Sequence, residues 1–309
     1  KSTHLNHAEV GAFSRPGDGI GRLGNSPPYG HQRYDCPESD NSSMDVSLAQ
    51  SIAGLSLPLA AMVTILLPML LALGLGVVIH AIFTPQELAA NASVGYVKFG
   101  FLTEVYAVIA ALTLVGAWDI YQNSRDIIQR ETNALYMMAL ATETYSNPEQ
   151  AELRAAMRYS IRNYASEVVG EEWLLMQGKG RSESSEIAFQ LLARTFLDAE
   201  PVTNAQQGIA QNIPQWISNV SEARLARLSI MSRTISSMVW SLLLTASVAV
   251  LAFQWFFGGS RLAIHYAMGV FISIIIGGVL LTCVKLSFPF SGQSPLLSTR
   301  PFLVLMEIR

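Results

Sequence analysis

The sequence predicts an all-α membrane protein with four transmembrane helices and a cytoplasmic helical block between the second and third spans. Half of its 309 residues are hydrophobic and only 14% are charged, whereas soluble domains average about 25% charged residues. Four apolar stretches reach the roughly 20 residues that a span needs. Residues 122–233 hold 11 Lys/Arg and 13 Asp/Glu of the chain's 20 and 23, so we expect this block to face water.

The composition also excludes several classes of protein. A net charge of -3 lacks the basic patch that a nucleic-acid partner requires. Two cysteines, Cys36 and Cys283, cannot build a disulfide framework. No H-E-x-x-H, Walker A or G-x-S-x-G motif is present, so the sequence predicts no enzyme, cofactor or metal centre. The lipid bilayer is the first expected partner.

The chain divides into five predicted segments. A tail rich in Gly, Pro and Ser opens it and is expected to be disordered, and Met44 near its end is a candidate for the true start of the protein. Two pairs of spans then flank the charged block, and a short tail closes the chain. The predicted boundaries are 1–50, 51–121, 122–233, 234–287 and 288–309.

The spans are expected at Ile52–Phe83, Phe99–Tyr121, Ile235–Phe257 and Leu262–Leu286. The first is long and contains prolines, so it is either a kinked or tilted helix or a short lead-in followed by the true span. The last two are joined by Gly258 to Arg261, which predicts a tight helical hairpin.

The distribution of basic residues predicts the topology. Arg125 and Arg130 follow the second span, and Arg224, Arg227 and Arg233 precede the third. The other two connections carry one basic residue each, so the middle block should be cytoplasmic. Four spans then place both termini in the cytoplasm.

No Pro or Gly interrupts residues 117–146, so the second span should continue unbroken into the charged block. The block should contain three or four helices, starting after Asn147-Pro148, at Ser185–Asp198 and at Gln215–Arg233.

Two groups of acidic residues in the block need separate explanations. Glu131 falls on an otherwise apolar helical stripe, where a buried carboxylate needs a partner. Arg224 or Arg227 is the predicted partner, in a structural ion pair that locks the helices together. Glu167, Glu171 and Glu172, by contrast, are expected on a solvated helix face.

Several short motifs, in their order and spacing, resemble the bacterial bestrophin-like membrane protein family. The second span begins Gly100-Phe101-Leu102 and ends Trp118-Asp119-Ile120-Tyr121, and the last span ends in Phe288-Pro289-Phe290-Ser291-Gly292. Between them lie Arg125, Arg130 to Leu135, Tyr164, Glu172-Trp173, Arg224 and Arg227-Leu228. The resemblance covers roughly Ile52 to Phe302.

The resemblance implies a function as well as a fold. Bestrophins are pentameric anion channels whose second span lines the pore, so a homo-oligomer that passes inorganic anions is the first hypothesis. A non-conducting scaffold, docking a partner through its cytoplasmic helices, is the alternative. The resemblance does not extend to the Arg-Trp-Trp-Glu run of bestrophins. Nor does it extend to a calcium clasp, because Glu307 stands alone after the last span.

The second span has two distinct faces on a helical wheel. Its small residues Gly100, Ala107 and Ala111 share one face with Glu104 and Trp118, and small residues favour close packing on neighbouring helices. The other face either forms a hydrophobic pore constriction, as the resemblance implies, or meets lipid and other spans. This aliphatic face consists of Phe101, Val105, Val108, Leu112 and Val115.

Three further groups in the spans are candidates for function or packing. Glu104 is either a functional intramembrane acid, which would favour cations at a pore mouth, or a carboxylate at headgroup level near Lys98. His80 and His265 are expected to pack at the membrane interface, with a metal or pH role as the alternative. In the last span, Gly269, Ser273 and Gly277 repeat every four residues, which predicts a tight helix contact.

Overall fold

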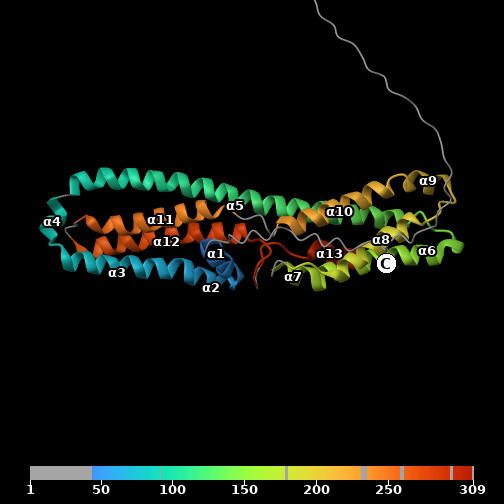
Figure 1. The fold of residues 1–309 in the computed structure, drawn as a ribbon, viewed down its shortest axis with the longest axis horizontal. Coiled ribbons are helices and arrows are strands. Elements are labelled where there is room, and N and C mark those ends of the chain that lie inside the picture. The colour runs from blue at the N-terminus through green and yellow to red at the C-terminus, as the bar shows by residue number, and fades with distance from the viewer. Residues whose placement is uncertain are drawn as a thin grey trace, which may run out of the picture. The chain divides into compact units, whose positions relative to one another are not determined.

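The computed structural model describes residues 44–90, 92–177, 180–230, 235–257, 261–292 and 295–307, and these contain helices and no strand. Figure 1 shows helices that run along a common direction. Among the described residues, four helical segments are long and apolar enough to cross a membrane. The predicted all-α fold with four spans is therefore confirmed.

The first span is the least regular of the four. It consists of α2 (Leu57–Ala61), a π-helical turn η1 (Met62–Leu66) and α3 (Leu67–Ile82). Pro68 has no N–H to pair with the Thr64 carbonyl, and its ring crowds that carbonyl, which accounts for the wider turn just before it.

A separate short helix, α1 (Met44–Gly54), precedes this span and begins before the predicted start at Ile52. Residues 44–50 are therefore helical rather than part of a disordered tail, and residues 1–43 lie outside the described residues. The buried Lys285 ammonium donates to the carbonyls of Ala53 (3.0 Å) and Leu55 (2.9 Å) at the end of α1. A cation suits the carbonyl end of a helix, so Lys285 fixes the α1 end against the last span.

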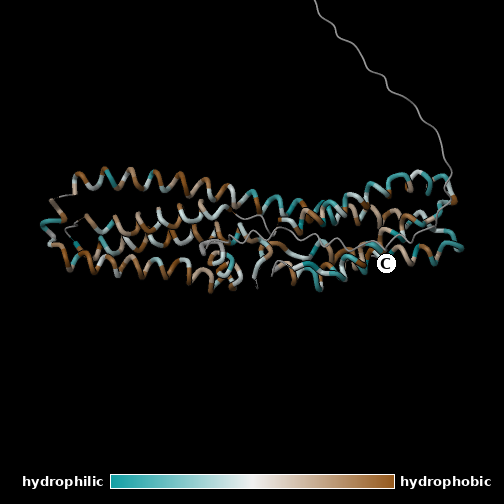
Figure 2. The backbone as a smooth tube through the Cα atoms, viewed as in Figure 1, coloured by the Kyte–Doolittle hydropathy of each residue, from teal (hydrophilic) through white to brown (hydrophobic). Residues whose placement is uncertain are grey.

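The second span belongs to one helix of 51 residues, α5 (Ala92–Thr142). At 1.5 Å per residue it is about 75 Å long, more than twice the roughly 30 Å of a hydrocarbon core. The structure thus confirms the uninterrupted helix across Trp118 and Arg125. Figure 2 shows the two environments of α5, because its first half is mainly hydrophobic and its second half is increasingly hydrophilic.

The third and fourth spans lie beside the first half of α5. They are α11 (Ser237–Phe253), extended by the 3₁₀ turn η4 (Gln254–Phe256), and α12 (Leu262–Ser287). The predicted hairpin between them lies mostly outside the described residues, and so does Arg233. A short helix, α4 (Pro85–Ala90), joins the first span to α5 and was not anticipated.

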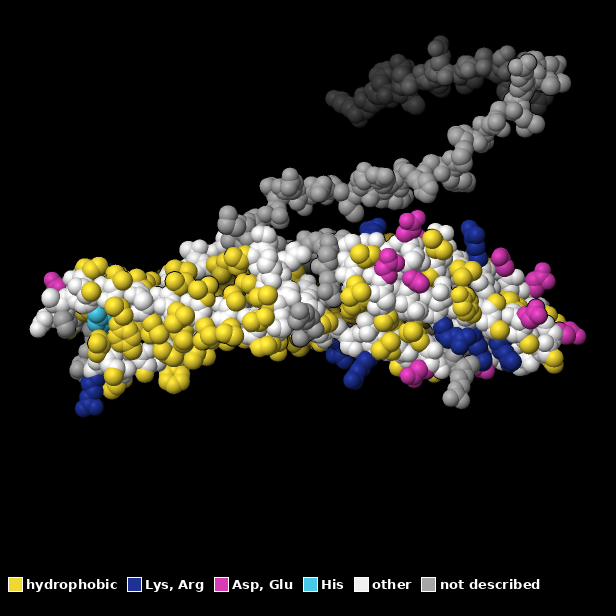
Figure 3. Space-filling view, turned by 90° about the horizontal axis from the view of Figure 1, so that it is seen from below, with side chains coloured by type: hydrophobic (Ala, Val, Ile, Leu, Met, Phe, Trp, Pro, Cys, Tyr) yellow, Lys and Arg dark blue, Asp and Glu magenta, His cyan; other side chains and the backbone are white. Residues whose placement is uncertain are grey.

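The second half of α5 carries the charged half of the molecule, which we define as residues 122–230 together with α13 (Arg300–Met306). Figure 3 shows hydrophobic side chains over the membrane-spanning half and both signs of charge over this one. The helix predicted after Asn147-Pro148 consists of consecutive helical segments that end at Gln177. The helix at Asn204–Ala210 and α13 were not anticipated. The elements are η2 (Pro148–Gln150), α6 (Ala151–Glu167), η3 (Val168–Glu172), α7 (Trp173–Gln177), α8 (Glu183–Leu197), α9 (Asn204–Ala210) and α10 (Ile213–Ile230).

The core of the charged half forms where the predicted stripes of α5 and α6 meet. Leu135, Met138, Met157, Ile161 and Tyr164 are buried in one cluster. Since every third or fourth residue of each helix points inward, these two stripes also decide which polar side chains are buried.

Candidate functional site

The aliphatic face of α5 is exposed along the whole span. Its exposed fractions run from 40% for Val105 to 70% for Leu112, and all five predicted residues are exposed: Phe101, Val105, Val108, Leu112 and Val115. The opposite side of α5 packs on α11 and α12. Within one chain, the aliphatic face is therefore available to lipid, to another subunit or to a pore.

The small-residue face is not covered within the chain, so the expected packing of Gly100, Ala107 and Ala111 on a neighbouring helix stays a prediction about another subunit. Ala107, Ala111 and Trp118 are exposed, and Gly100 is half-buried. The buried side consists of Tyr106, Ala110, Thr113 and Ala117. Thr113 can be buried because its hydroxyl donates to the Ile109 carbonyl (2.8 Å), which leaves no unsatisfied donor.

Glu104 lies on the exposed side of α5, next to the aliphatic face. Among the described residues, no salt bridge to Glu104 is found. Its carboxylate is therefore free to meet a headgroup, a permeating ion or a second subunit.

Of the two arginines predicted to pair with Glu131, Arg227 is the one that does so. Its Nε donates to Glu131 Oε2 (2.8 Å) and its Nη2 to Glu131 Oε1 (3.0 Å), which is the bidentate geometry of strong pairs. Tyr164 donates its hydroxyl to Glu131 Oε1 at 2.6 Å. All three side chains are completely buried, so α5, α6 and α10 are joined by charge-assisted hydrogen bonds in their common core.

A second carboxylate, Glu172, extends this pair into an ionic network. Its Oε2 accepts from Arg227 Nη2 (2.8 Å) and its Oε1 from Arg224 Nη2 (2.9 Å). Arg224 therefore contacts Glu172 and Glu186 rather than Glu131. The expectation that Glu172 lies on a solvated face is wrong, because Glu172 is completely buried. It follows the buried Val168 by four residues, so it continues the buried stripe of α6 into η3.

Two further groups close the network. Arg227 Nη1 donates to the Met176 sulfur (3.0 Å), and the Phe302 ring of α13 lies 5.8 Å from the guanidinium carbon of Arg227, within cation–π range. Neither contact was anticipated, because the sequences of α7 and α13 carry no pattern that predicts a contact with Arg227. The helix α13 thus covers Arg227, a completely buried cation of the charged half.

Burial and pairing shift the pKa values of the network in consistent directions. Burial and the adjacent Glu131 raise the pKa of Tyr164 well above its usual value, so its hydroxyl stays a proton donor. Burial disfavours the Arg227 cation, but the Glu131 carboxylate outweighs that effect and raises the pKa of Arg227. Burial opposes the ionisation of Glu186 too, but the hydrogen bonds from Arg224 and Gln190 together with the Arg224 charge lower the pKa of that carboxyl. These groups therefore hold fixed protonation states near neutral pH, which suits a structural role.

The small-residue face of α12 lies in close helix contacts. A Cβ on Gly277 would lie 2.6 Å from the Thr64 carbonyl oxygen, and one on Gly269 would lie 2.8 Å from the Trp255 ring. Ser273 is buried between them and donates to the Gly269 carbonyl at 2.8 Å. Because these positions carry no side chain larger than that of serine, α12 can approach the first span and η4 this closely.

The two histidines of the spans lie together. Their ring centroids are 5.8 Å apart, and both rings meet Trp255 edge-on. His80 Nδ1 is 2.8 Å from the Gly76 carbonyl oxygen. Within the described residues, no group of three or more His, Cys, Asp or Glu could hold a metal ion.

These features define a class: a four-span helical membrane protein whose second span continues as the central helix of a charged helical half. A family model described as the Bestrophin-like domain matches residues 66–296. The chain therefore belongs to the Bestrophin-like family.

Solved structures show the same fold at low sequence identity. A crystal structure of a bacterial Bestrophin homolog from Klebsiella pneumoniae, carrying one substitution, matches with a TM-score of 0.63 at 10% identity over 79% of this chain and 97% of that chain. A second structure of this homolog, solved by Zn-SAD phasing, gives a TM-score of 0.61 at 10% identity over 79% and 96%. No curated protein matches the chain.

Proposed function

We propose that the chain is one subunit of a homo-oligomeric anion channel, a pentamer if it assembles as bestrophins do, with the aliphatic face of α5 lining the pore. One observation carries the proposal: a continuous apolar face is left uncovered along a span whose opposite side is packed. A hydrophobic lining of this kind gates by dewetting. The anion as the transported species comes from the resemblance to bestrophins.

The proposed location is the bacterial inner membrane, with the charged half and both termini in the cytoplasm. Arg125 and Arg130 are exposed on α5 directly after the span, where the positive-inside rule expects basic residues on the cytoplasmic side. The pore would then open into a vestibule bounded by the charged half of each subunit.

Planar-bilayer recording in asymmetric chloride tests the pore directly. Leu112→Ala should raise the single-channel conductance roughly twofold or more, because it widens a hydrophobic constriction. The matched control is Leu70→Ala, which removes a similarly exposed leucine from α3 (60% against 70% for Leu112) and should leave conductance unchanged. A monomer in detergent, or equal conductance in both variants, would contradict this pore assignment.

Glu104 supplies a separate test of selectivity. If α5 lines the pore, the subunits place a ring of Glu104 carboxylates near one mouth, and such a ring opposes anion entry. Glu104→Gln should therefore shift the reversal potential toward that of chloride. Glu200→Gln, which removes an exposed carboxylate from the charged half, is the control, and an identical shift in both variants would exclude a local effect of Glu104.

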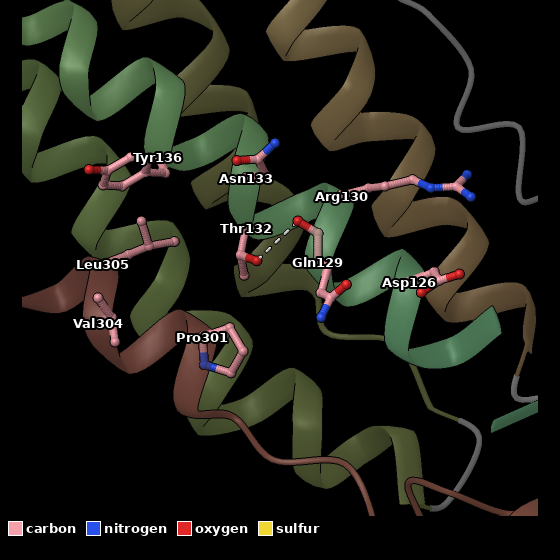
Figure 4. Close-up of a pocket in the computed structure, with 9 residues that line it drawn as sticks. All are labelled: Asp126, Gln129, Arg130, Thr132, Asn133, Tyr136, Pro301, Val304 and Leu305. Atoms are coloured by element: carbon pink, nitrogen blue, oxygen red, sulfur yellow. Dashed lines mark hydrogen bonds between the residues drawn. The ribbon is translucent and has the colours of Figure 1, made fainter. Parts of the chain in front are cut away.

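A specific surface supports the alternative function, a scaffold that docks a partner. A hollow of about 640 Å³ lies between α5 and α13. Figure 4 shows its lining, with Thr132 and Tyr136 on α5 and Pro301 and Val304 on α13. Tyr136 is 48% and Val304 60% exposed, which leaves apolar surface beside polar groups. If neither wild type nor Leu112→Ala conducts current in the bilayer, although both are shown to be inserted, the scaffold function would be favoured over the channel.

A further inference from the structure

A cavity of about 380 Å³ lies at the end of the spans remote from the charged half. The start of α5, the end of α11 and the first turns of α12 form its walls. Phe99 and Phe257 supply aromatic surface, and Met268, which is 60% exposed, lies at its outer side. A mostly apolar cavity with a few polar groups is the usual form of a ligand site.

The cavity contains a buried hydrogen-bond acceptor that has no partner. Gln254 is 5% exposed, and its amide nitrogen donates to the Leu251 carbonyl (3.1 Å). That bond fixes which end of the amide is nitrogen, and it leaves the oxygen Oε1 without a hydrogen bond. Buried polar groups are normally paired, so this oxygen is free to accept a hydrogen bond from a donor that enters the cavity.

The same cavity has a second unpaired polar atom and a positive charge. His265 Nε2 is buried without a partner. Arg261, which precedes α12, is exposed and forms no salt bridge with a described residue. The first turn of the 26-residue helix α12 adds its N-terminal partial charge. An anionic group fits beside Arg261, while a hydroxyl or other donor fits against Gln254.

Gly269 keeps the inner wall of the cavity open. A Cβ there would lie 3.6 Å from Gln254 Oε1 and 2.8 Å from the Trp255 ring. A larger residue would therefore cover the unpaired oxygen and displace the tryptophan. The glycine thus serves helix packing and access to Gln254 at once.

We propose that this cavity binds a phospholipid whose headgroup carries both an anionic phosphate and a hydroxyl donor, as phosphatidylglycerol does. Arg261 pairs with the phosphate, Gln254 Oε1 accepts from a headgroup hydroxyl, and the aromatic walls cover the glycerol and upper acyl chains. The exposed apolar residues Ile264 and Met268 beside the cavity favour a lipid over a soluble anion with the same groups. This site is independent of whether the protein conducts ions.

Native mass spectrometry of the full chain in detergent tests the proposal with three probes. These are dioctanoyl phosphatidylglycerol, dioctanoyl phosphatidylcholine, which has no donor, and glycerophosphoglycerol, which has no acyl chains. Phosphatidylglycerol should bind most tightly. Arg261→Gln and Gln254→Leu should each weaken it about tenfold, the loss expected for one charge-assisted or buried hydrogen bond.

Arg300→Gln, which removes an exposed arginine from α13, should leave binding unchanged. Gln254→Leu should unfold close to the wild-type temperature, because deleting the unpaired buried acceptor offsets the loss of the bond to Leu251. Weaker binding by this variant is then not a folding defect. Equal binding of phosphatidylcholine, or unchanged binding in both cavity variants, would overturn the proposal. If glycerophosphoglycerol binds as tightly as phosphatidylglycerol, the cavity binds the headgroup, and a lipid with acyl chains is not its specific ligand.

Discussion

Arg227→Met is expected to destabilise the charged half by about 3–5 kcal/mol, because it leaves the buried Glu131 carboxylate without a cation. Glu131 and Glu172 are completely buried, and Arg227 donates to both. Arg224 still reaches Glu172 in this variant, but no other cation contacts Glu131 among the described residues. Thermal unfolding in detergent, followed by far-ultraviolet circular dichroism, measures the loss.

The partly exposed pair Arg158–Glu143 provides the control. These side chains form a 2.6 Å ion pair in which Glu143 is 61% and Arg158 18% exposed, and pairs that reach solvent contribute about 0–1 kcal/mol. Arg158→Met should therefore have a small effect. If the two arginine substitutions cost the same, the buried network does not hold the charged half together.

A compensated variant separates lost charge pairing from lost packing. Combining Arg227→Met with Glu131→Leu removes the stranded carboxylate, and apolar replacements of buried ion pairs are often neutral or stabilising. We expect this double variant to recover much of the stability lost by Arg227→Met. No recovery would mean that the specific hydrogen bonds of Glu131, including the one from Tyr164, matter more than its charge.

Gly277→Ala is expected to destabilise the membrane-spanning half by about 1–3 kcal/mol through overpacking. The added Cβ would lie 2.6 Å from the Thr64 carbonyl oxygen and 2.8 Å from the Ile65 Cα. Both are backbone atoms, so the first span and α12 must separate. The melting temperature in detergent, and in lipid nanodiscs, measures the effect.

The neighbouring Gly278 makes a control that the sequence alone would not distinguish. A Cβ there meets nothing within 4 Å, and alanine in a helix interior is favoured over glycine by roughly 0.5–1 kcal/mol. Gly278→Ala should therefore be neutral or slightly stabilising. Equal destabilisation by both substitutions would show that flexibility of α12, rather than its contact with η1, accounts for the loss.

Most of the fold could be predicted from the sequence, because membrane spans are determined by local composition. Four apolar stretches, the concentration of charge in one block and the absence of helix breakers after Trp118 were sufficient for the spans and for the long α5. The boundary of α1 and the helix α13 were missed. Their sequences carry no strong periodicity, and their helices depend on contacts such as Lys285 with the α1 carbonyls and Phe302 with Arg227.

The sequence by itself determined that Glu131 needed a cation, since a carboxylate on an apolar stripe cannot stay unpaired. Only the tertiary structure decided which cation it was and added Glu172 to the network, because the choice of partners depends on how α5, η3 and α10 pack together. The same holds for the unpaired Gln254 oxygen, which became visible once three helix ends met around it. Burial and partner choice depend on contacts between segments distant in sequence, whereas span length and helical continuity depend on neighbouring residues.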